Sequence, residues 1–237
     1  MLDAVLFDWG GTLMQDEWSD EIALEGHAAG IAALSREGLP TAEAFTLHLA
    51  ETFPPAGEDE IDIAAVMRSS FAHHGVDLED DDLRLFLRTA NEVWASYYSL
   101  AASTHALLES LRNRGLKLAL VSNTASPEWL LRPVLAHQGL VDRVDAIVLS
   151  SEVGKRKPHP AIFERALAEL DVRADEALFV GDRLDADVGG ASRVGMHTAQ
   201  ALWFRADDVQ AEVEPDFQAF IQMDVVNVVD RLIGSSA

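Results

Sequence analysis

The sequence contains no cysteine and no long apolar run, and each absence excludes a class of protein. Without cysteine, there can be no disulfide, zinc-thiolate site or cysteine nucleophile. The sequence has no run of about 18 or more apolar residues, so it predicts no membrane span. Its first residues also lack the pattern of a secretory signal. We therefore expect a cytoplasmic protein in which any metal is bound by oxygen or imidazole ligands.

Positive charge is also scarce, since the formal net charge of the 237 residues is −22 at pH 7. Residues 14–98 hold 18 Asp and Glu against 4 Arg and no Lys. Such a chain repels nucleic acid and anionic membranes, so we expect a small molecule as its partner and neither of those. We interpret this acidic region as a solvated helical surface. Composition leaves open whether the protein is a monomer or a homodimer.

Four short apolar runs predict the strands of a parallel sheet. Helical patterns precede the last three, and this alternation is typical of an α/β fold. The runs are Ala4–Phe7, Lys117–Val121, Ala146–Leu149 and Ala177–Val180. The sequence also predicts a helix with Ser126 as N-cap and Pro127 in its first turn, ending near Gly139. A closing amphipathic helix is predicted over 225–233.

The stretch from Met14 to about Leu100 has a different pattern, with helical spacing of its apolar residues. Breaks at 38–40, 54–57 and Gly75 divide it into three to five helices, and no strand is needed there. We interpret 14–99 as a helical cap domain inserted into an α/β core domain of residues 1–13 and 100–237.

Polar residues follow each predicted strand, where ligands bind in open parallel sheets. Asp8 follows the first run, Ser122 and Asn123 the second, Lys157 lies beyond the third, and Asp182 follows the fourth. Carboxylates, a hydroxyl and a lysine are the groups needed to bind and attack a phosphate. Each alone has an ordinary explanation, such as a turn, a helix N-cap or a surface lysine.

Together these segments resemble the four motifs of haloacid dehalogenase superfamily hydrolases. In chain order they are Phe7-Asp8-Trp9-Gly10-Gly11-Thr12-Leu13, Val121-Ser122-Asn123, the stretch from Ser151 through Lys157-Pro158 to Phe163, and Val180-Gly181-Asp182 with Asp187. The resemblance implies a three-layer, Rossmann-like α/β fold. The helical insertion resembles the cap of the subfamily that includes dehalogenases, phosphonatases and phosphoglycolate-type phosphatases.

The resemblance also implies roles for these residues in a Mg²⁺-dependent hydrolase of small phosphorylated molecules. Asp8 would be the nucleophile that forms an aspartyl-phosphate, and Lys157, preferred over Lys155 because it precedes Pro158, would neutralise charge. Mg²⁺ would be bound by Asp8, the Gly10 carbonyl and Asp182, with Asp187 in an outer shell. The phosphate would be bound by Thr12, Ser122 and Asn123.

One position departs from the family, because Gly10 stands where its phosphatases carry the Asp that acts as general acid and base. Dehalogenases carry Tyr there, and phosphonatases need a cap lysine that residues 14–98 lack. The sequence therefore favours phosphate hydrolysis over dehalogenation and phosphonate cleavage. A non-catalytic phosphate-binding module is the alternative from a different class.

A substitute acid could come from the insertion, and the sequence alone does not rank its candidates. They are Asp16, Glu17, His27, His73 and His74. His73 and His74 are most simply a helix end. Trp94, Tyr97 and Tyr98 could line a pocket, but their spacing favours core packing.

Overall fold

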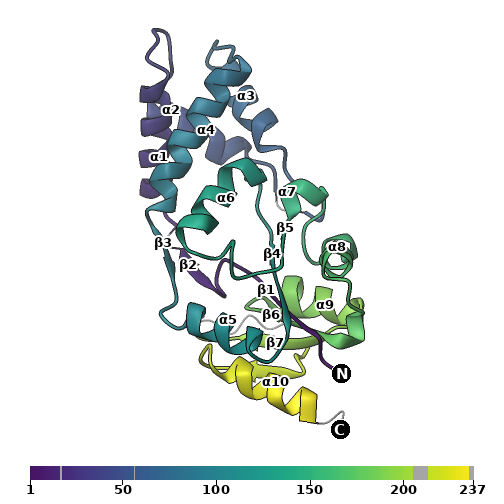
Figure 1. Ribbon diagram of the computed structural model, residues 1–237. Coiled ribbons are helices and arrows are strands. Elements are labelled where there is room, and N and C mark those ends of the chain that lie inside the picture. Colours follow the sequence, from purple (N-terminus) through teal and green to yellow (C-terminus); the bar gives the residue numbers. More distant parts are fainter. Residues whose placement is uncertain (17, 56, 205–212, 235–237) are drawn as a thin grey trace.

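The computed structural model describes the chain except for residues 17, 56, 205–212 and 235–237 and the side chain of Asp16. It has two lobes, a sheet covered by helices and a group of four helices that projects from one end of it (Figure 1). No described helix combines the length and the apolar character that a membrane-spanning segment requires.

Six parallel strands form the sheet, in the order β5-β4-β1-β6-β7-β8. Their bounds are β1 Ala4–Phe7, β4 Lys117–Ser122, β5 Ala146–Leu149, β6 Ala177–Gly181, β7 His197–Ala201 and β8 Phe217–Ala219. The central strand β1 pairs with β4 and β6, and Phe7 lies opposite Val180. Because neighbouring parallel strands end at the same edge, Asp8, Ser122 and Asp182 lie close together.

Side chains of β1 alternate between two apolar cores, one on each face of the sheet. Val5 and Phe7 join the core covered by α5 (Thr104–Arg112), α6 (Glu128–His137) and α10 (Asp224–Gly234). Ala4 and Leu6 join the core covered by α8 (Pro160–Leu170) and α9 (Gly189–Arg193). The three-layer α/β fold predicted from the sequence is therefore confirmed. Three shorter helices are α7 (Ser150–Val153), η1 (Ala174–Glu176) and η2 (Leu184–Val188).

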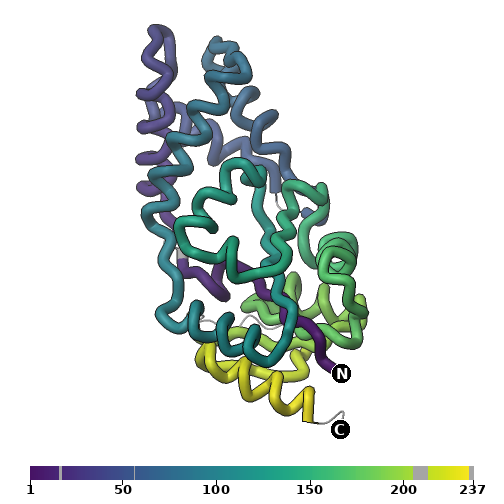
Figure 2. The backbone as a smooth tube through the Cα atoms, in the orientation of Figure 1, coloured from purple at the N-terminus to yellow at the C-terminus, as the bar shows by residue number. Residues whose placement is uncertain are grey.

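The projecting lobe consists of α1 (Asp20–Ala33), α2 (Ala42–Thr52), α3 (Ile63–His73) and α4 (Asp80–Ala95). Figure 2 shows these helices as the purple to blue segments away from the sheet. They have their own core, in which Phe45, Phe71 and Phe86 are fully buried against one another. Four helices agree with the predicted three to five, and the division into core and cap domains stays a prediction.

Two strands border this lobe, so the prediction that residues 14–100 need no strand is wrong at both ends. β2 (Met14–Asp16) and β3 (Tyr98–Leu100) pair antiparallel where the chain leaves the sheet lobe and returns to it. The Ala101 amide also donates a hydrogen bond to the Leu13 carbonyl at 3.1 Å. Strands of three residues are too short to show an alternating pattern.

Strands β7 and β8 were not predicted either, because β7 contains polar residues that the fold buries. Thr198 and Gln200 are 2% and 7% exposed. The Thr198 backbone N–H and hydroxyl both donate to Asp216 Oδ2, at 2.9 Å and 3.2 Å. This contact with a residue 18 positions away is invisible to local patterning. The closing helix was predicted correctly as α10.

Helix α6 begins one residue later than predicted, with Pro127 rather than Ser126 at the N-cap. The Glu128 amide donates to Glu152 Oε1 at 2.9 Å, so a distant carboxylate accepts the hydrogen bond that a local cap would have accepted. The helix ends at His137, and Gly139 follows with φ +68°, as the predicted stop requires.

Candidate active site

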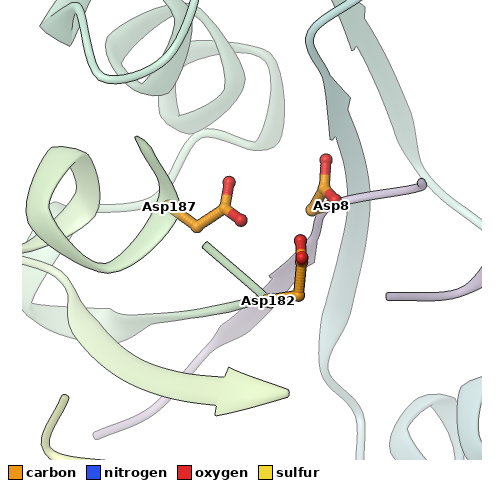
Figure 3. A group of neighbouring side chains, drawn as sticks. All are labelled: Asp8, Asp182 and Asp187. Carbon is orange, nitrogen blue, oxygen red and sulfur yellow. The ribbon is translucent and has the colours of Figure 1, made fainter. Parts of the chain in front are cut away.

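Three aspartates converge at the carboxyl edge of the sheet (Figure 3). Asp8 directly follows β1, Asp182 directly follows β6, and Asp187 lies in η2. One carboxylate oxygen from each lies within 4.8 Å of the other two. Asp8 and Asp187 are only 7% and 1% exposed. Carboxylates this close and this buried repel one another unless cations lie between them, and carboxylate oxygens are preferred Mg²⁺ ligands.

Lys157 supplies one positive charge to this cluster from the loop between α7 and α8. Its Nζ forms ion pairs with Asp8 Oδ1 at 2.6 Å and with Asp187 Oδ1 at 2.8 Å. It also donates a hydrogen bond to the Val121 carbonyl at 2.9 Å. Two hydrogen bonds, to Asp8 and to the Val121 carbonyl, and the ion pair with Asp187 therefore hold the ammonium in one position.

Burial and the positive charge of Lys157 shift the pKa of Asp8 in opposite directions. Burial raises its pKa to about 7, the carboxylates of Asp187 and Asp182 push it the same way, and Lys157 opposes them. For Lys157, burial lowers the pKa, but the carboxylates of Asp187 and Asp8 outweigh it, so the pKa lies above its usual value. The neighbouring carboxylates thus favour the charged form of Lys157, whereas burial and those same carboxylates disfavour ionisation of Asp8.

Two glycines make room for the other aspartates. A Cβ on Gly181 would lie 2.4 Å from Asp187 Cγ, so any side chain there would displace that carboxylate. Gly11 has φ +79°, and a Cβ on it would lie 3.0 Å from Asp182 Cγ. The acidic cluster thus depends on glycine at both positions.

Asn123 lines the cavity described below, and its side chain holds the backbone of Lys157. Its Oδ1 accepts a hydrogen bond from the Lys157 backbone N–H at 2.7 Å, and its Nδ2 donates to the Lys157 carbonyl at 2.9 Å. The side-chain amide therefore supports the lysine loop, and phosphate binding at Asn123 stays a prediction. Ser122, predicted beside it, is 3% exposed and lines the cavity described below. Lys155 lies elsewhere, in an ion pair with Asp59.

Gly10 and Thr12 complete the loop after Asp8. A Cβ on Gly10 would meet nothing nearer than Met14 Cε at 3.9 Å, so there is room for a side chain at this position. Thr12 is fully buried within this loop, and its hydroxyl donates to Asp8 Oδ2 at 3.4 Å. Thr12 is not among the cavity-lining residues, which suits support of Asp8 better than contact with a ligand.

A cavity of about 380 Å³ opens above the aspartates. It is large enough for a small metabolite and has polar walls. Its lining residues are Asp8, Trp9, Gly10, Gly11, Met14, Tyr98, Ser122, Asn123, Thr124, Arg156, Lys157, Asp182, Arg183, Ala186 and Asp187. Sequence reasoning missed Arg156 and Arg183, because a single arginine in a loop carries no local signal.

The substitute acids proposed for the insertion do not reach this cavity where they are described. His27 is buried inside the helical lobe, where its Nδ1 lies 2.8 Å from Thr46 Oγ1. His73 and His74 end α3 and pack against His48. Glu17 and the side chain of Asp16 lie outside the described residues.

The predicted aromatic residues divide between the two lobes. Trp94 and Tyr97 contact α1, through the Ile22 carbonyl and the Glu25 carboxylate. Tyr98 lines the cavity and packs edge-on against Trp9, with ring centroids 5.5 Å apart. Tyr98 therefore packs against the core of the sheet lobe and is also a wall of the site, whereas Trp94 and Tyr97 are half-buried and lie outside the apolar core clusters of the described residues.

A family model described as haloacid dehalogenase-like hydrolase matches residues 2–195. The chain belongs to this family. It is therefore a hydrolase, and the loop after β1, Lys157 and the loop with Asp182 and Asp187 all lie within the matched region.

Named relatives share this assignment. The chain is 29% identical to a glyceraldehyde 3-phosphate phosphatase of Methanopyrus kandleri, over 98% of this chain and 99% of that protein. It is 37% identical to a ribulose-1,5-bisphosphate 5-phosphatase of Halopiger xanaduensis, but that match spans only 47% of each chain. The crystal structure of a HAD phosphatase from Thermococcus onnurineus superposes with a TM-score of 0.64 at 25% identity, covering 96% of this chain and 98% of that one.

Proposed function

We propose that this hydrolase is a Mg²⁺-dependent phosphatase of small phosphorylated molecules, acting through an aspartyl-phosphate on Asp8. The observation that carries the proposal is the meeting of Asp8, Lys157, Asp182 and Asp187 in one small cavity. The relatives named as phosphatases of small phosphorylated sugars support this substrate class.

In the first step an Asp8 oxygen attacks phosphorus, and the bond from phosphorus to the leaving oxygen breaks with its electron pair on that oxygen. In the second step water attacks the same phosphorus, loses a proton, and returns Asp8 as a carboxylate with release of inorganic phosphate. The hydrogen bonds from Lys157 and Thr12 hold both Asp8 oxygens for this attack. Lys157 also neutralises negative charge that develops on the phosphoryl oxygens.

The acidic cluster fits a hard divalent cation. Asp8, Asp182 and the Gly10 carbonyl would hold Mg²⁺, which would neutralise phosphoryl oxygens and keep Asp8 ionised. Asp187 contacts Lys157 and accepts a hydrogen bond from the Arg183 backbone N–H at 2.9 Å. Its role is therefore to orient the lysine and the acidic loop.

Gly10 removes the usual general acid, and no other carboxylate of the described residues lines the cavity besides the three aspartates. Leaving groups that depart without a proton should therefore react fastest. Gly10 in place of Tyr and the retained acidic cluster favour phosphate hydrolysis over dehalogenation, and the absence of lysine from 14–98 argues against phosphonate cleavage.

The test is a hydrolysis screen of small phosphate esters with Mg²⁺, alongside acid-quenched single turnovers analysed by peptide mass spectrometry. We expect phosphate release and a transient phosphoryl group on the peptide that contains Asp8. Turnover with no such adduct would contradict the covalent mechanism. Tight phosphate binding with no turnover of any ester would instead favour the alternative of a non-catalytic phosphate-binding module.

A further inference from the structure

The helical lobe contacts the sheet lobe beside Lys157, through residues 58–60 of the α2–α3 connection and 154–156 of the α7–α8 loop. We call this contact the latch. The Glu60 N–H donates to the Gly154 carbonyl at 3.1 Å, and the Arg156 N–H donates to the Glu58 carbonyl at 2.8 Å. These backbone bonds fix the two loops side by side.

Two ion pairs of unequal exposure cross the latch. Lys155 pairs with Asp59, and their side chains are 38% and 84% exposed. Arg156 Nη1 pairs with Glu60 Oε1 at 2.6 Å, and these side chains are 18% and 4% exposed. The second pair is shielded from solvent, so it constrains its partners more strongly than the first.

Glu60 is itself held from several directions. Its Oε1 accepts a hydrogen bond from the Ile61 N–H at 2.8 Å, and its Oε2 accepts one from the Ser150 hydroxyl. Ser150 is fully buried and accepts in turn from the Thr124 N–H at 2.7 Å. Glu60 therefore presents a fixed carboxylate to Arg156.

Arg156 lines the cavity next to Lys157, whereas Lys155 does not. A guanidinium has five N–H donors in one plane, and the ion pair of Arg156 with Glu60 engages Nη1. Lys157 is fully occupied by the aspartates and the Val121 carbonyl. Besides Lys157, Arg156 is therefore the cavity-lining cation of the described residues that is held largely out of solvent, with its side chain 18% exposed. Arg183, the third, pairs with Asp185 where both side chains are more than half exposed.

We propose that Arg156 is a specificity-determining residue that binds a carboxylate on the leaving portion of the substrate, and that Glu60 of the helical lobe is its positioning residue. The inference rests on the proposed function and names the substrate class of that site. The planar fork of arginine matches a carboxylate in geometry. A single guanidinium, partly neutralised by Glu60, suits one negative charge better than the nearly two of a second phosphate.

The experiment compares two substrates that differ only at this group, 2-phosphoglycolate and 2-hydroxyethyl phosphate. Wild type should prefer the carboxylate in kcat/KM. Arg156→Gln should lower kcat/KM for 2-phosphoglycolate by about 10- to 100-fold, the usual effect of losing a hydrogen bond to a charged group, and change the neutral substrate by less than about threefold.

Two matched controls separate substrate recognition from the latch itself. Lys155→Gln breaks the neighbouring ion pair without touching the cavity, and Arg183→Gln removes the other arginine that lines it. Neither should change the preference between the two substrates. A larger selective loss in Arg183→Gln, or an equal loss on both substrates in Arg156→Gln, would overturn the assignment.

Binding without turnover distinguishes failure of this inference from failure of the proposed function. Calorimetry with Mg²⁺ would compare 3-phosphonopropionate with 3-hydroxypropylphosphonate, whose carbon–phosphorus bonds should stay intact because residues 14–98 lack the lysine that phosphonate cleavage needs. A preference for the carboxylate that disappears in Arg156→Gln supports the inference even if no ester is turned over. Equal binding of both by wild type, with phosphatase activity present, overturns the inference alone.

Glu60→Gln tests the positioning role through the split between KM and kcat. It should raise KM for 2-phosphoglycolate about 3- to 10-fold with little change in kcat, and leave KM for 2-hydroxyethyl phosphate unchanged. A merely structural role for Glu60 would affect both substrates alike. That outcome would remove Glu60 from the proposal.

Discussion

Carboxylates are abundant at the catalytic edge of the sheet and on the helical lobe, but their neighbours differ. At the edge, Asp8 and Asp187 are buried on either side of one ammonium, that of Lys157. Within the described part of the lobe, acidic side chains pair with the lobe's own arginines at exposed sites, such as Arg36 with Asp82, whereas the buried side chain of Glu60 pairs with Arg156 of the sheet lobe. Buried charges require compensating partners, whereas exposed ones are stabilised by water. The acidic excess of the lobe therefore contributes to solubility, whereas the three carboxylates at the edge are the ones placed to take part in catalysis.

The largest effect should come from removing the buried nucleophile and leaving a nearby exposed acid untouched. We expect Asp8→Asn to reduce kcat to about 10⁻⁴ of wild type or below, because the amide cannot attack phosphorus. Asp185→Asn, whose side chain is 58% exposed, should retain nearly full activity. Initial rates of phosphate release with Mg²⁺ decide this. Comparable rates for wild type and Asp8→Asn, or full activity after exhaustive chelation, would refute the mechanism.

The next effect concerns the two lysines of one loop. Lys157→Ala should lower kcat/KM by about 10²- to 10³-fold, because it removes the charge that faces the phosphoryl group. Lys155→Ala should change kcat/KM by no more than a few-fold, since its partner Asp59 is exposed. Thermal unfolding must accompany the kinetics, because Lys157→Ala also leaves Asp8 and Asp187 without their partner. A larger loss in Lys155→Ala would show that the lysine motif is misplaced.

His27 is a buried titratable group of the helical lobe, and its effect should fall on stability rather than on activity. Burial lowers the pKa of His27 to about 4. The unfolded chain, with a histidine pKa near 6.5, therefore takes up this proton more readily than the folded protein as the pH falls. Stability that is fully present above about pH 6.5 should decline toward pH 4, by up to about 3 kcal/mol.

Urea unfolding of wild type and His27→Gln measures this contribution as a difference between the two free energies of unfolding. The difference should shift against wild type between pH 6.5 and pH 4, because the glutamine has no proton to gain. Parallel pH profiles for the two proteins would show that His27 contributes nothing to acid sensitivity.

The sequence predicted the parts of the fold that are written in local patterns. Four apolar strands and α10 were predicted within a few residues, because each has its own periodicity and stop signals. β7 was missed because Thr198 and Gln200 are stabilised by distant partners, and the start of α6 shifted because Glu152 caps it. Long-range contacts of this kind leave no trace in a local window.

The site, like the fold, has parts that local sequence patterns predict and parts that depend on long-range contacts. Asp8, Lys157, Asp182 and Asp187 were predicted together from ordered motifs, and they meet at one edge of the sheet. The use of Asn123 to hold the lysine backbone, and the contact of Arg156 with a residue 96 positions earlier, depend on how the two lobes pack. Sequence patterns could identify the chemical groups but not these supports.

The smallest change in rate should come from placing an acid at Gly10. At this position the catalytic edge has no side chain and has room for one. Without that acid, wild type should hydrolyse aryl and acyl phosphates faster than alkyl phosphates, because an alkoxide needs a proton to depart and a nitrophenolate does not. A positioned general acid contributes about 10²- to 10⁴-fold, of which Gly10→Asp should recover at least about tenfold for alkyl esters. The open space around a Cβ at this position, with only Met14 Cε at 3.9 Å, makes the variant sterically feasible.

The ratio of alkyl to aryl kcat/KM is the decisive measurement for Gly10→Asp, because a general loss of Mg²⁺ affinity or of stability would lower both rates together. Gly10→Asn is the matched control, since it has nearly the same size and cannot donate a proton as an acid. The ratio should rise in Gly10→Asp and stay near the wild-type value in Gly10→Asn. If wild type already cleaves alkyl esters as fast as aryl esters, another group supplies the proton. Tyr98 on the cavity wall is then the first described residue to replace, as Tyr98→Phe, and Asp16 and Glu17 follow as sequence candidates.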